Sequence, residues 1–361
     1  MTLHIFNPEH DIALAANLEN FTAPHAGRQL RHDLGFLPVL WADGSDVVLV
    51  EDESLAEKNL RKLCQGKTIQ FPKESNRFQG RQSVCSGQVT RVEPWGWDLA
   101  LRSQLLRMGI SESLLPTKEQ LAVIRQLSHR RLAAETLQQI VSQGNGVLTG
   151  EAFECKSVEE VRQLMLHHPK VVLKAPWSSS GRGIRFVSDF SLIENWLHNL
   201  LTRQGSVMLE PYYNKVKDFG MEFYSDGKGR ADFLGLSLFH TTNGAYTGNI
   251  LATETFKQEM LGRYVSVGLL RNVSEMLCRL LGDTFANRYE GPFGVDMMIV
   301  AAENGDRCLL HPCVEINLRR TMGHVALTLG RLVNPRQDDE LVRVMRIVYE
   351  ENNYKLKIQR L

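Results

Sequence analysis

Two largely apolar stretches in the last third of the chain lie on either side of a short polar segment. The stretches are residues 291–302, GPFGVDMMIVAA, and 307–320, RCLLHPCVEINLRR, and Asn304-Gly305 lies between them. An Asn-Gly pair between two apolar runs is a strong signal for a hairpin. The pattern therefore predicts two antiparallel strands, with Glu303 opposite Asp306 and Asp296 opposite Cys313.

On this register Asp296 projects from the same face as Glu315 and Asn317, because successive side chains of a strand alternate between faces. Asp296 lies diagonal to Glu315, with about 7–8 Å between their backbones. Two carboxylates and an amide oxygen suit Mg²⁺ or Mn²⁺. A solvated outer face of a hairpin accounts for the same spacing equally well. Pro312 cannot donate to the strand ladder and favours a bulge, which would shift the register.

The same reading predicts an alternation of short strands and helices before and after this hairpin. Thr117 and Gln120 form a capping box at the start of one helix. Residues 1–115 are expected to form a small α/β unit. The predicted strands are residues 3–6, 38–41, 46–50, 170–175, 184–187, 206–209 and 230–239. The predicted helices are residues 24–34, 54–63, 94–108, 117–127, 130–141, 190–202, 256–281, 321–332 and 337–349, and residues 240–250 are expected to be a long loop.

A loop rich in Ser and Gly, residues 176–183, joins two of the predicted strands. It offers backbone N–H groups and hydroxyls to an anion, and its small residues leave the approach open. Lys174 stands near the end of the preceding strand. The alternative is an ordinary hairpin turn, with Lys174 extending to solvent.

The segment Asn7 to Asp11 follows the first predicted strand, at the edge where open α/β sheets contact ligands. The commoner roles are expected here: Asp11 as the N-cap of the next helix, and His10 as a solvated loop residue.

Composition narrows the class of protein. The chain has 361 residues, 43% of them hydrophobic, and a formal net charge of +1. That charge gives no basic footprint for nucleic acid, and no run reaches the roughly 20 apolar residues of a membrane span. The N-terminus lacks the pattern of a signal peptide, and the six cysteines form no CxxC pair. A cytoplasmic protein without nucleic-acid or membrane partners is expected, and its oligomeric state stays open.

The order of these residues resembles the ATP-grasp superfamily of ATP-dependent carboxylate–amine ligases. The resemblance covers roughly residues 115–330 and is most specific at Glu315-Ile-Asn317-Leu-Arg319, which matches the family's E-x-N-x-R strand, preceded by its strand Asp, Asp296. It implies an ATP-grasp fold of two α+β subdomains clasping ATP, after a small α/β domain. The implied domains are an N-terminal substrate domain, a first grasp subdomain with linker helices, and a second grasp subdomain with C-terminal helices. Their bounds are 1–115, 116–205 and 206–361.

The resemblance also implies roles for individual residues. Two Mg²⁺ or Mn²⁺ ions would be bound by Asp296, Glu315 and Asn317, and Arg319 would stabilise the transferred phosphoryl group. Lys174 would contact the α/β-phosphates, and an arginine at Arg130 or Arg131 would assist; Arg131 is taken as the candidate. The other implied ATP contacts are the loop residues Ser178, Ser179, Ser180, Gly181 and Gly183, the adenine hinge at Glu210 and Tyr212, and Asp218 at the ribose.

The implied activity is the conversion of a small-molecule carboxylate, with ATP, into an acyl phosphate that an amine or thiol attacks. Charge builds up between anionic reactants, so cations at Lys174, Arg319 and the metal ions would lower the barrier. Two alternatives remain open: phosphoryl transfer to an acceptor that is not a carboxylate, and a nucleotide-binding module without activity.

Overall fold

A computed structural model describes residues 1–64, 78–80, 86–144, 146–178, 183–242, 245–302, 305, 307–333 and 342–360. The chain divides into two compact units. The first unit comprises Met1–Arg125, Thr247–Phe256 and Arg319–Leu361. The second unit comprises Gln126–Tyr246 and Lys257–Leu318. Each unit is therefore assembled from segments that are distant in the sequence.

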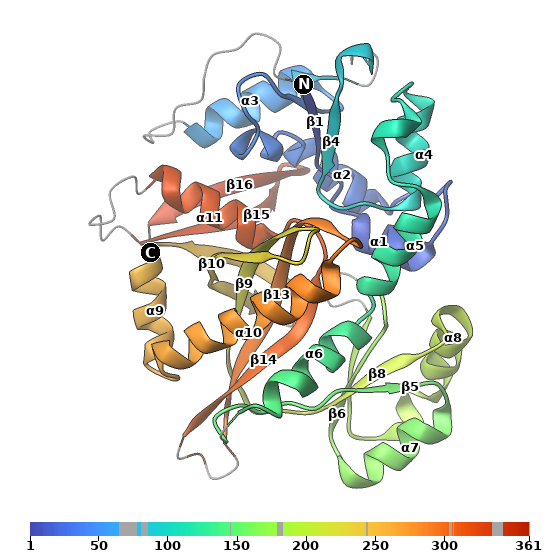
Figure 1. Ribbon diagram of the computed structural model, residues 1–361, viewed down its shortest axis with the longest axis vertical. Coiled ribbons are helices and arrows are strands. Elements are labelled where there is room, and N and C mark those ends of the chain that lie inside the picture. The colour runs from blue at the N-terminus through green and yellow to red at the C-terminus, as the bar shows by residue number, and fades with distance from the viewer. Residues whose placement is uncertain are drawn as a thin grey trace. The chain divides into compact units, whose positions relative to one another are not determined.

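The first unit contains a parallel sheet with the strand order β3-β2-β1-β4, drawn in blue and cyan in Figure 1. A second group of strands, β12, β15 and β16, pairs in antiparallel fashion. The elements up to residue 127 are β1 Thr2–Ile5, α1 His10–Ala16, α2 His25–Leu34, η1 Leu37–Leu40, β2 Val47–Leu49, α3 Glu53–Cys64, β3 Phe78–Gln79, η2 Ser86–Gln88, β4 Arg91–Pro94, α4 Leu99–Arg107, η3 Glu112–Leu114 and α5 Lys118–Leu127. The later elements are β12 Ala245–Leu251, α11 Met322–Val333, β15 Arg343–Glu350 and β16 Asn353–Arg360, and helix α9 Glu254–Gly262 begins in this unit and continues into the second.

The core of the first unit joins its N-terminal and C-terminal segments. Phe6 and Leu37 are buried in one cluster with Leu251, Leu329 and Met345. Burial of large apolar side chains stabilises a fold by about 1.5–3 kcal/mol each. The segment after residue 318 is therefore an integral part of this unit.

The second unit contains two four-stranded antiparallel sheets with the strand orders β5-β8-β6-β7 and β10-β9-β13-β14. Figure 1 shows the long strands β13 and β14 running beside helices α6 and α10. The elements are α6 Arg131–Val141, β5 Phe153–Cys155, α7 Val158–His167, β6 Val171–Lys174, β7 Ile184–Val187, η4 Phe190–Leu192, α8 Glu194–Gln204, β8 Val207–Pro211, β9 Lys215–Asp226, β10 Ala231–Ser237, β11 Phe239–Thr242, α10 Val267–Phe285, β13 Glu290–Ala301 and β14 Cys308–Asn317.

Alternation along β13 fixes which face of its sheet is buried. Phe293, Val295, Met297 and Ile299 are at most 1% exposed. Phe293 stacks on Phe223 of β9 and meets Phe285 of α10 edge to face. The residues between them, Asp296 among them, therefore point to the opposite face.

Several predicted elements are confirmed. The strands at residues 3–6, 46–50, 170–175, 184–187 and 206–209 and the helices at 24–34, 54–63, 117–127, 130–141 and 321–332 are present within a few residues. The capping box is formed too: Thr117 N donates to Gln120 Oε1 at 2.8 Å, and Gln120 N donates to Thr117 Oγ1 at 3.2 Å.

Four predicted elements are wrong. Residues 38–41 lie mostly in the 3₁₀ helix η1 rather than in a strand, and the expected loop at 240–250 is largely strand, in β11 and β12. The helix expected over 256–281 is divided into α9 and α10. The part of the predicted helix 337–349 that is described belongs to strand β15, and residues 337–341 lie outside the described residues.

The hairpin register is correct near the turn and wrong at the site. Ala301 pairs with Cys308 and Met298 with His311, as predicted, but the register then shifts, and Asp296 pairs with Glu315 rather than Cys313. Pro312 lies in the shifted segment and has no N–H to donate, which favours such a bulge. The turn residues Glu303, Asn304 and Asp306 lie outside the described residues.

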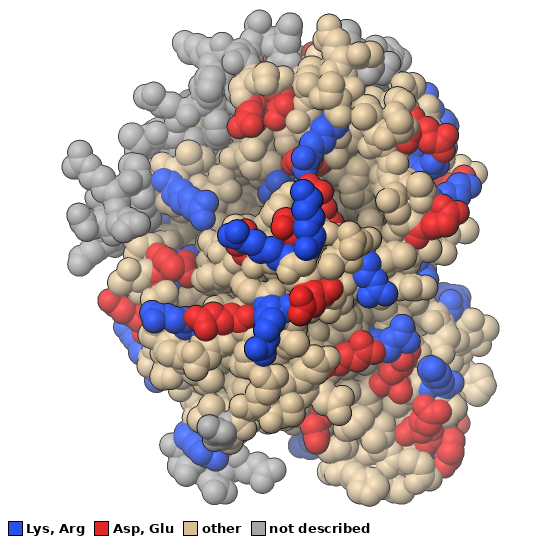
Figure 2. All heavy atoms as spheres, in the orientation of Figure 1, with Lys and Arg blue, Asp and Glu red and all other residues tan. Residues whose placement is uncertain are grey.

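Acidic and basic side chains are interspersed on the face of the molecule drawn in Figure 2. None of the helices in the described part of the chain is long and apolar enough to cross a membrane. The cysteines described, Cys64, Cys155, Cys278, Cys308 and Cys313, are free thiols. Cys155 and Cys313 are buried and the other three are partly exposed, while Cys85 lies outside the described residues.

Candidate nucleotide and metal site

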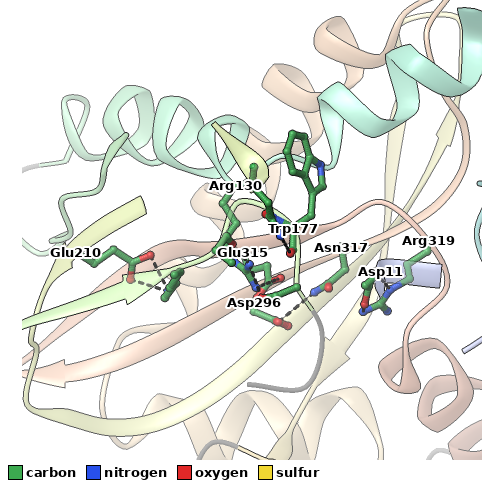
Figure 3. A network of polar contacts seen from close by, with 12 residues as sticks. Asp11, Arg130, Trp177, Glu210, Asp296, Glu315, Asn317 and Arg319 are labelled. Carbon is green, nitrogen blue, oxygen red and sulfur yellow. Dashed lines mark hydrogen bonds and ion pairs between the residues drawn. The ribbon is translucent and has the colours of Figure 1, made fainter. Parts of the chain in front are cut away.

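The polar face of the sheet β10-β9-β13-β14 brings the predicted metal ligands together. Asp296 pairs directly with Glu315 on one side and with Gly220 of β9 on the other. Asn317 Nδ2 donates a hydrogen bond to Asp296 Oδ2 at 3.0 Å (Figure 3). The bulge therefore brings Asp296 and Glu315 closer than the predicted diagonal arrangement, since directly opposed side chains are nearest neighbours in a sheet.

Glycine leaves room beside these carboxylates. A Cβ added at Gly220 would lie 3.4 Å from Asp296 Oδ1 and 3.6 Å from Glu222 Oε1. Glu222 pairs with Gly294 in the next row of the sheet and is 3% exposed. Nothing in the sequence pattern distinguished Glu222 from other strand acids, and only the register brings it beside the predicted set.

Arg130 extends into this site from the residue before α6. Its Nη2 donates to Glu315 Oε1 at 2.7 Å, and its Nη1 donates to Ser178 Oγ at 2.9 Å and to the Ala175 carbonyl oxygen (Figure 3). Arg130 is 7% exposed. The neighbouring Arg131 side chain is 45% exposed and pairs with Glu154 at 3.2 Å and Glu135 at 3.8 Å. Of the two arginines, Arg130 is the one that contacts the other site residues.

Lys174 and Glu210 form a buried ion pair in the other sheet of the second unit. Lys174 Nζ lies 2.7 Å from Glu210 Oε2 and 2.6 Å from Oε1. The two residues are 5% and 6% exposed. The alternative in which Lys174 extends to solvent is therefore wrong. Pairing offsets the desolvation cost of burying the two charges.

The Ser/Gly loop is described at its two ends. A Cβ added at Gly183 would lie 2.5 Å from Ser178 Cβ, so only glycine fits there. Ala175 N donates to the Gly183 carbonyl oxygen at 2.8 Å, which closes the base of the loop. Ser179, Ser180 and Gly181 lie outside the described residues.

The two remaining candidates of this unit are more exposed. Tyr212 is 54% exposed and contacts Phe186 edge to face, with 6.2 Å between ring centroids. Asp218, in β9, accepts a hydrogen bond from Lys215 Nζ at 2.6 Å. Tyr212 directly follows β8, and Asp218 is the fourth residue of β9.

Arg319 belongs to the first unit, where it forms a bidentate ion pair with Asp11. Its Nε donates to Asp11 Oδ1 at 2.8 Å and its Nη2 to Oδ2 at 2.7 Å (Figure 3). Asp11 lies in the first turn of α1, and Glu9 is at the N-cap position, so the predicted capping role of Asp11 is wrong. The partner of Arg319 was not predicted, because 308 residues separate the two in sequence.

The chemistry of the set around Asp296 fits a hard divalent cation. Two carboxylates and an amide supply oxygen ligands, and half a turn of the Asn317 amide presents its oxygen instead of its nitrogen. Burial raises the pKa of the Cys313 thiol, so this neighbour stays protonated and does not offer a soft ligand. Within the described ranges there is no cluster of three or more His, Cys, Asp or Glu side chains suited to a metal, so a cation here depends on Asn317 and on phosphate oxygens.

No family model matches the sequence, and no curated protein matches it. Solved structures do match the fold. N5-carboxyaminoimidazole ribonucleotide synthetase from Thermus thermophilus gives a TM-score of 0.51 at 14% identity, covering 97% of this chain and 84% of that one. A protein from Archaeoglobus fulgidus described as belonging to the ATP-grasp superfamily gives 0.50 at 13% identity, covering 100% and 99%. The chain has an ATP-grasp fold.

A third ATP-grasp structure was solved with ADP. It is N5-carboxyaminoimidazole synthetase from Staphylococcus aureus, with a TM-score of 0.50, 12% identity, and coverage of 97% of this chain and 83% of that one. The ATP-grasp fold expected from the E-x-N-x-R strand is thus confirmed over nearly the whole chain.

Proposed function

We propose that this chain is an ATP-dependent ligase that activates a small-molecule carboxylate as an acyl phosphate for attack by an amine or a similar nucleophile. The observation that carries the proposal is the arrangement of Asp296, Glu315 and Asn317 on one sheet face of an ATP-grasp fold. The ADP bound to the Staphylococcus aureus structure supports a nucleotide as the ligand.

We assign the divalent cations, Mg²⁺ or Mn²⁺ and two in number, to Asp296, Glu315 and Asn317. When bound, such ions would neutralise negative charge on the phosphate oxygens. Arg130 holds Glu315 in a charge-assisted hydrogen bond. If Glu315 turned to a cation, the Arg130 guanidinium would be available to a phosphate oxygen.

We also propose the nucleotide contacts that the resemblance to the ATP-grasp superfamily implies. Lys174 would contact the α/β-phosphates, and the loop from Ser178 to Gly183 would cover the β/γ-phosphates. Glu210 and Tyr212 would bind the adenine and Asp218 the ribose. Arg319 would stabilise the transferred phosphoryl group, a role that requires it to exchange Asp11 for a phosphate oxygen.

The reaction balances without a nucleophilic side chain. A carboxylate oxygen of the substrate bonds to the γ-phosphorus as the bond from that phosphorus to the β–γ bridging oxygen breaks, and ADP leaves. The amine then bonds to the acyl carbon, inorganic phosphate leaves, and the amine nitrogen loses a proton. Preorganised cations supply the stabilisation where the negative charge increases.

The test is trapping of the acyl phosphate. The purified chain is incubated with Mg-ATP, a panel of small carboxylates and hydroxylamine, and both ADP and hydroxamate are measured. A ligase gives both products with the right carboxylate. ADP formed without hydroxamate, in the presence of a hydroxyl-bearing acceptor, would instead indicate a phosphotransferase. Nucleotide binding without any turnover across the panel would leave a non-catalytic module.

Glu315→Gln is the informative variant, because it keeps the shape of the side chain and removes its charge. We expect it to abolish Mg²⁺-dependent ADP release. Glu275→Gln, on the exposed side of α10, is the matched control and should retain full activity. Equal activity in the two variants would contradict the assignment of the metal site.

A further inference from the structure

The first unit contains a polar pocket with a volume of about 170 Å³ that the nucleotide and metal assignments do not use. It opens where β1 and β4 end, which is where ligands bind in open parallel sheets. Asn7, Glu9 and Asp98 form its buried wall, and the exposed arginines Arg28 and Arg107 lie at its rim.

Glu9 is the feature of this pocket that requires a ligand. The residue is 8% exposed, and its Oε1 accepts a hydrogen bond from Arg31 Nη1. Its Oε2 is buried and has no hydrogen-bond partner within the described part of the chain. Burial raises the pKa of the Glu9 carboxyl, and the Arg31 charge opposes that rise. A buried carboxylate oxygen without a donor is costly, so a ligand that supplies one is favoured.

The wall around Glu9 is held in place by a hydrogen-bond network. Asp98 Oδ1 accepts from Leu101 N at 2.9 Å and caps α4. Asp98 Oδ2 accepts from Asn7 Nδ2 at 3.3 Å and lies 3.3 Å from His10 Nδ1. Asn7 is fixed in turn by the Gly96 carbonyl oxygen at 2.8 Å. Two carboxylates, Glu9 and Asp98, and one guanidinium, Arg31, therefore line this end of the pocket. The remaining negative charge favours a cationic group there.

The rim has the opposite charge. In the portion of the chain that is described, the Arg28 side chain makes no ion pair or hydrogen bond, and Arg107 Nη1 donates to Ser103 Oγ at 2.7 Å. Gln104 also lines the pocket and adds a side-chain amide. Guanidinium groups bind carboxylates and phosphates through paired N–H donors. The pocket is thus acidic at its buried end and basic at its opening.

We infer that this pocket binds a small α-amino acid, with its ammonium group at Glu9 Oε2 and its carboxylate at Arg28 and Arg107. The pocket volume of about 170 Å³ suits an amino acid with a short side chain. As the carboxylate or the amine of the ligase reaction, this amino acid deepens the proposed function and rests on it. Binding itself is independent of turnover.

The test is calorimetric titration of the full chain, without nucleotide, with each proteinogenic L-amino acid and its D-enantiomer. The best ligand is then compared with its analogue lacking the amino group, its analogue lacking the carboxylate, and inorganic phosphate. We expect both analogues to bind at least tenfold more weakly. If phosphate alone binds and no amino acid does at millimolar concentration, the pocket is an anion site and the inference is overturned.

Variants connect the binding to these residues. Glu9→Gln should weaken amino-acid binding at least tenfold but leave the weak binding of the amino-free analogue unchanged. Arg28→Gln tests the basic opening of the pocket. Because Arg28 is exposed, this variant avoids any folding defect that the Glu9 variant has. The exposed pair Glu57 and Arg61 of α3 gives the controls Glu57→Gln and Arg61→Gln. Unchanged affinity in both pocket variants would overturn the inference.

The same samples distinguish this inference from the proposed function. A Mg-ADP-dependent thermal shift that persists while no amino acid binds would remove only the pocket assignment. Amino-acid binding without any Mg-nucleotide shift would instead remove the ligase and leave an amino-acid-binding protein.

Discussion

From the buried ion pair of Lys174 and Glu210 we predict effects on both folding stability and nucleotide affinity. Removing one member leaves the other charged and unpaired in the interior, which costs about 3–5 kcal/mol. Lys174→Met and Glu210→Leu should each destabilise the fold by that order in chemical denaturation. The double variant should cost much less than the sum, because two apolar side chains replace both charges.

The exposed pair Arg162 and Glu194, at 2.7 Å with side chains 49% and 48% exposed, is the control for this cycle. Its coupling energy should stay within about 1 kcal/mol, the usual value for surface pairs. The double variant of the buried pair should still lose nucleotide affinity, because Lys174 is expected to contribute about 1.5–3 kcal/mol through a charge-assisted phosphate contact. Normal nucleotide affinity would reduce the pair to a structural role.

The burial of His311 predicts how folding stability depends on pH. It is fully buried against Gly150 and Tyr213, and neither ring nitrogen has a hydrogen-bond partner in the described part of the chain. Burial, assisted by the Lys174 charge, lowers the pKa of His311 from 6.5 to about 3. The unfolded chain therefore binds a proton between pH 6.5 and 3 that the folded chain does not, and stability falls as the pH falls through this window.

His311→Leu should flatten this dependence. The slope of the unfolding free energy against pH should decrease by up to about 1.4 kcal/mol per pH unit below about pH 6.5. Denaturant titrations at a series of pH values provide the measurement. His198→Leu, at an exposed position of α8, should leave the slope unchanged, and equal slopes for wild type and His311→Leu would contradict the burial argument.

At the scale of single elements, local signals in the sequence were reliable and distant pairings were not. The capping box at Thr117 and the register next to the hairpin turn depend on residues a few positions apart, and both formed as predicted. The register shift near Pro312 places Glu315 opposite Asp296. The proline indicated that a bulge could occur there, but not which residues would then pair.

The errors have the same origin. Residues 240–250 were expected in a loop, but Asn249 pairs with Met345, and β15 pairs in turn with β16. A strand whose partner is about one hundred residues away is decided by tertiary contacts more than by its own propensity. His10 was expected in solvent and is 1% exposed, because Gly96 leaves room for its ring. The proximity of Asp296, Glu315 and Asn317 was predictable from the strand pattern. The choice of Arg130 over Arg131, the position of Glu222 and the partner of Arg319 required the fold.

Substitution of Gly220 tests whether a cation binds at the sheet face beside Asp296. Valine there would place two methyl groups between Asp296 and Glu222, whereas the alanine Cβ meets Asp296 Oδ1 at an ordinary 3.4 Å. Gly220→Val should weaken Mg²⁺-dependent ADP binding at least tenfold in calorimetry, and Gly220→Ala should have a smaller effect. A valine variant that is folded and binds Mg-ADP normally would mean that the cation does not use this face.

At the scale of the whole chain, the proposed ligand-binding residues lie partly in one unit and partly in the other. Amide hydrogen exchange can measure ligand binding in each unit separately. The residues assigned to the cation and to the nucleotide's base, ribose and α/β-phosphates lie in the second unit, whereas Arg319 and the polar pocket lie in the first. Ligands slow exchange most strongly where they suppress local opening, and they stabilise only the states to which they bind.

Mg-ADP should therefore slow exchange chiefly in residues 171–174, 207–211 and 293–297. The amino acid should slow it chiefly in residues 5–13 and 96–104. Mg²⁺ without nucleotide is the control for the first set, and Glu9→Gln for the second. If Mg-ADP protected only the pocket segments, the nucleotide would have to be reassigned to the first unit, and the cation assignment to Asp296, Glu315 and Asn317 would be lost with it.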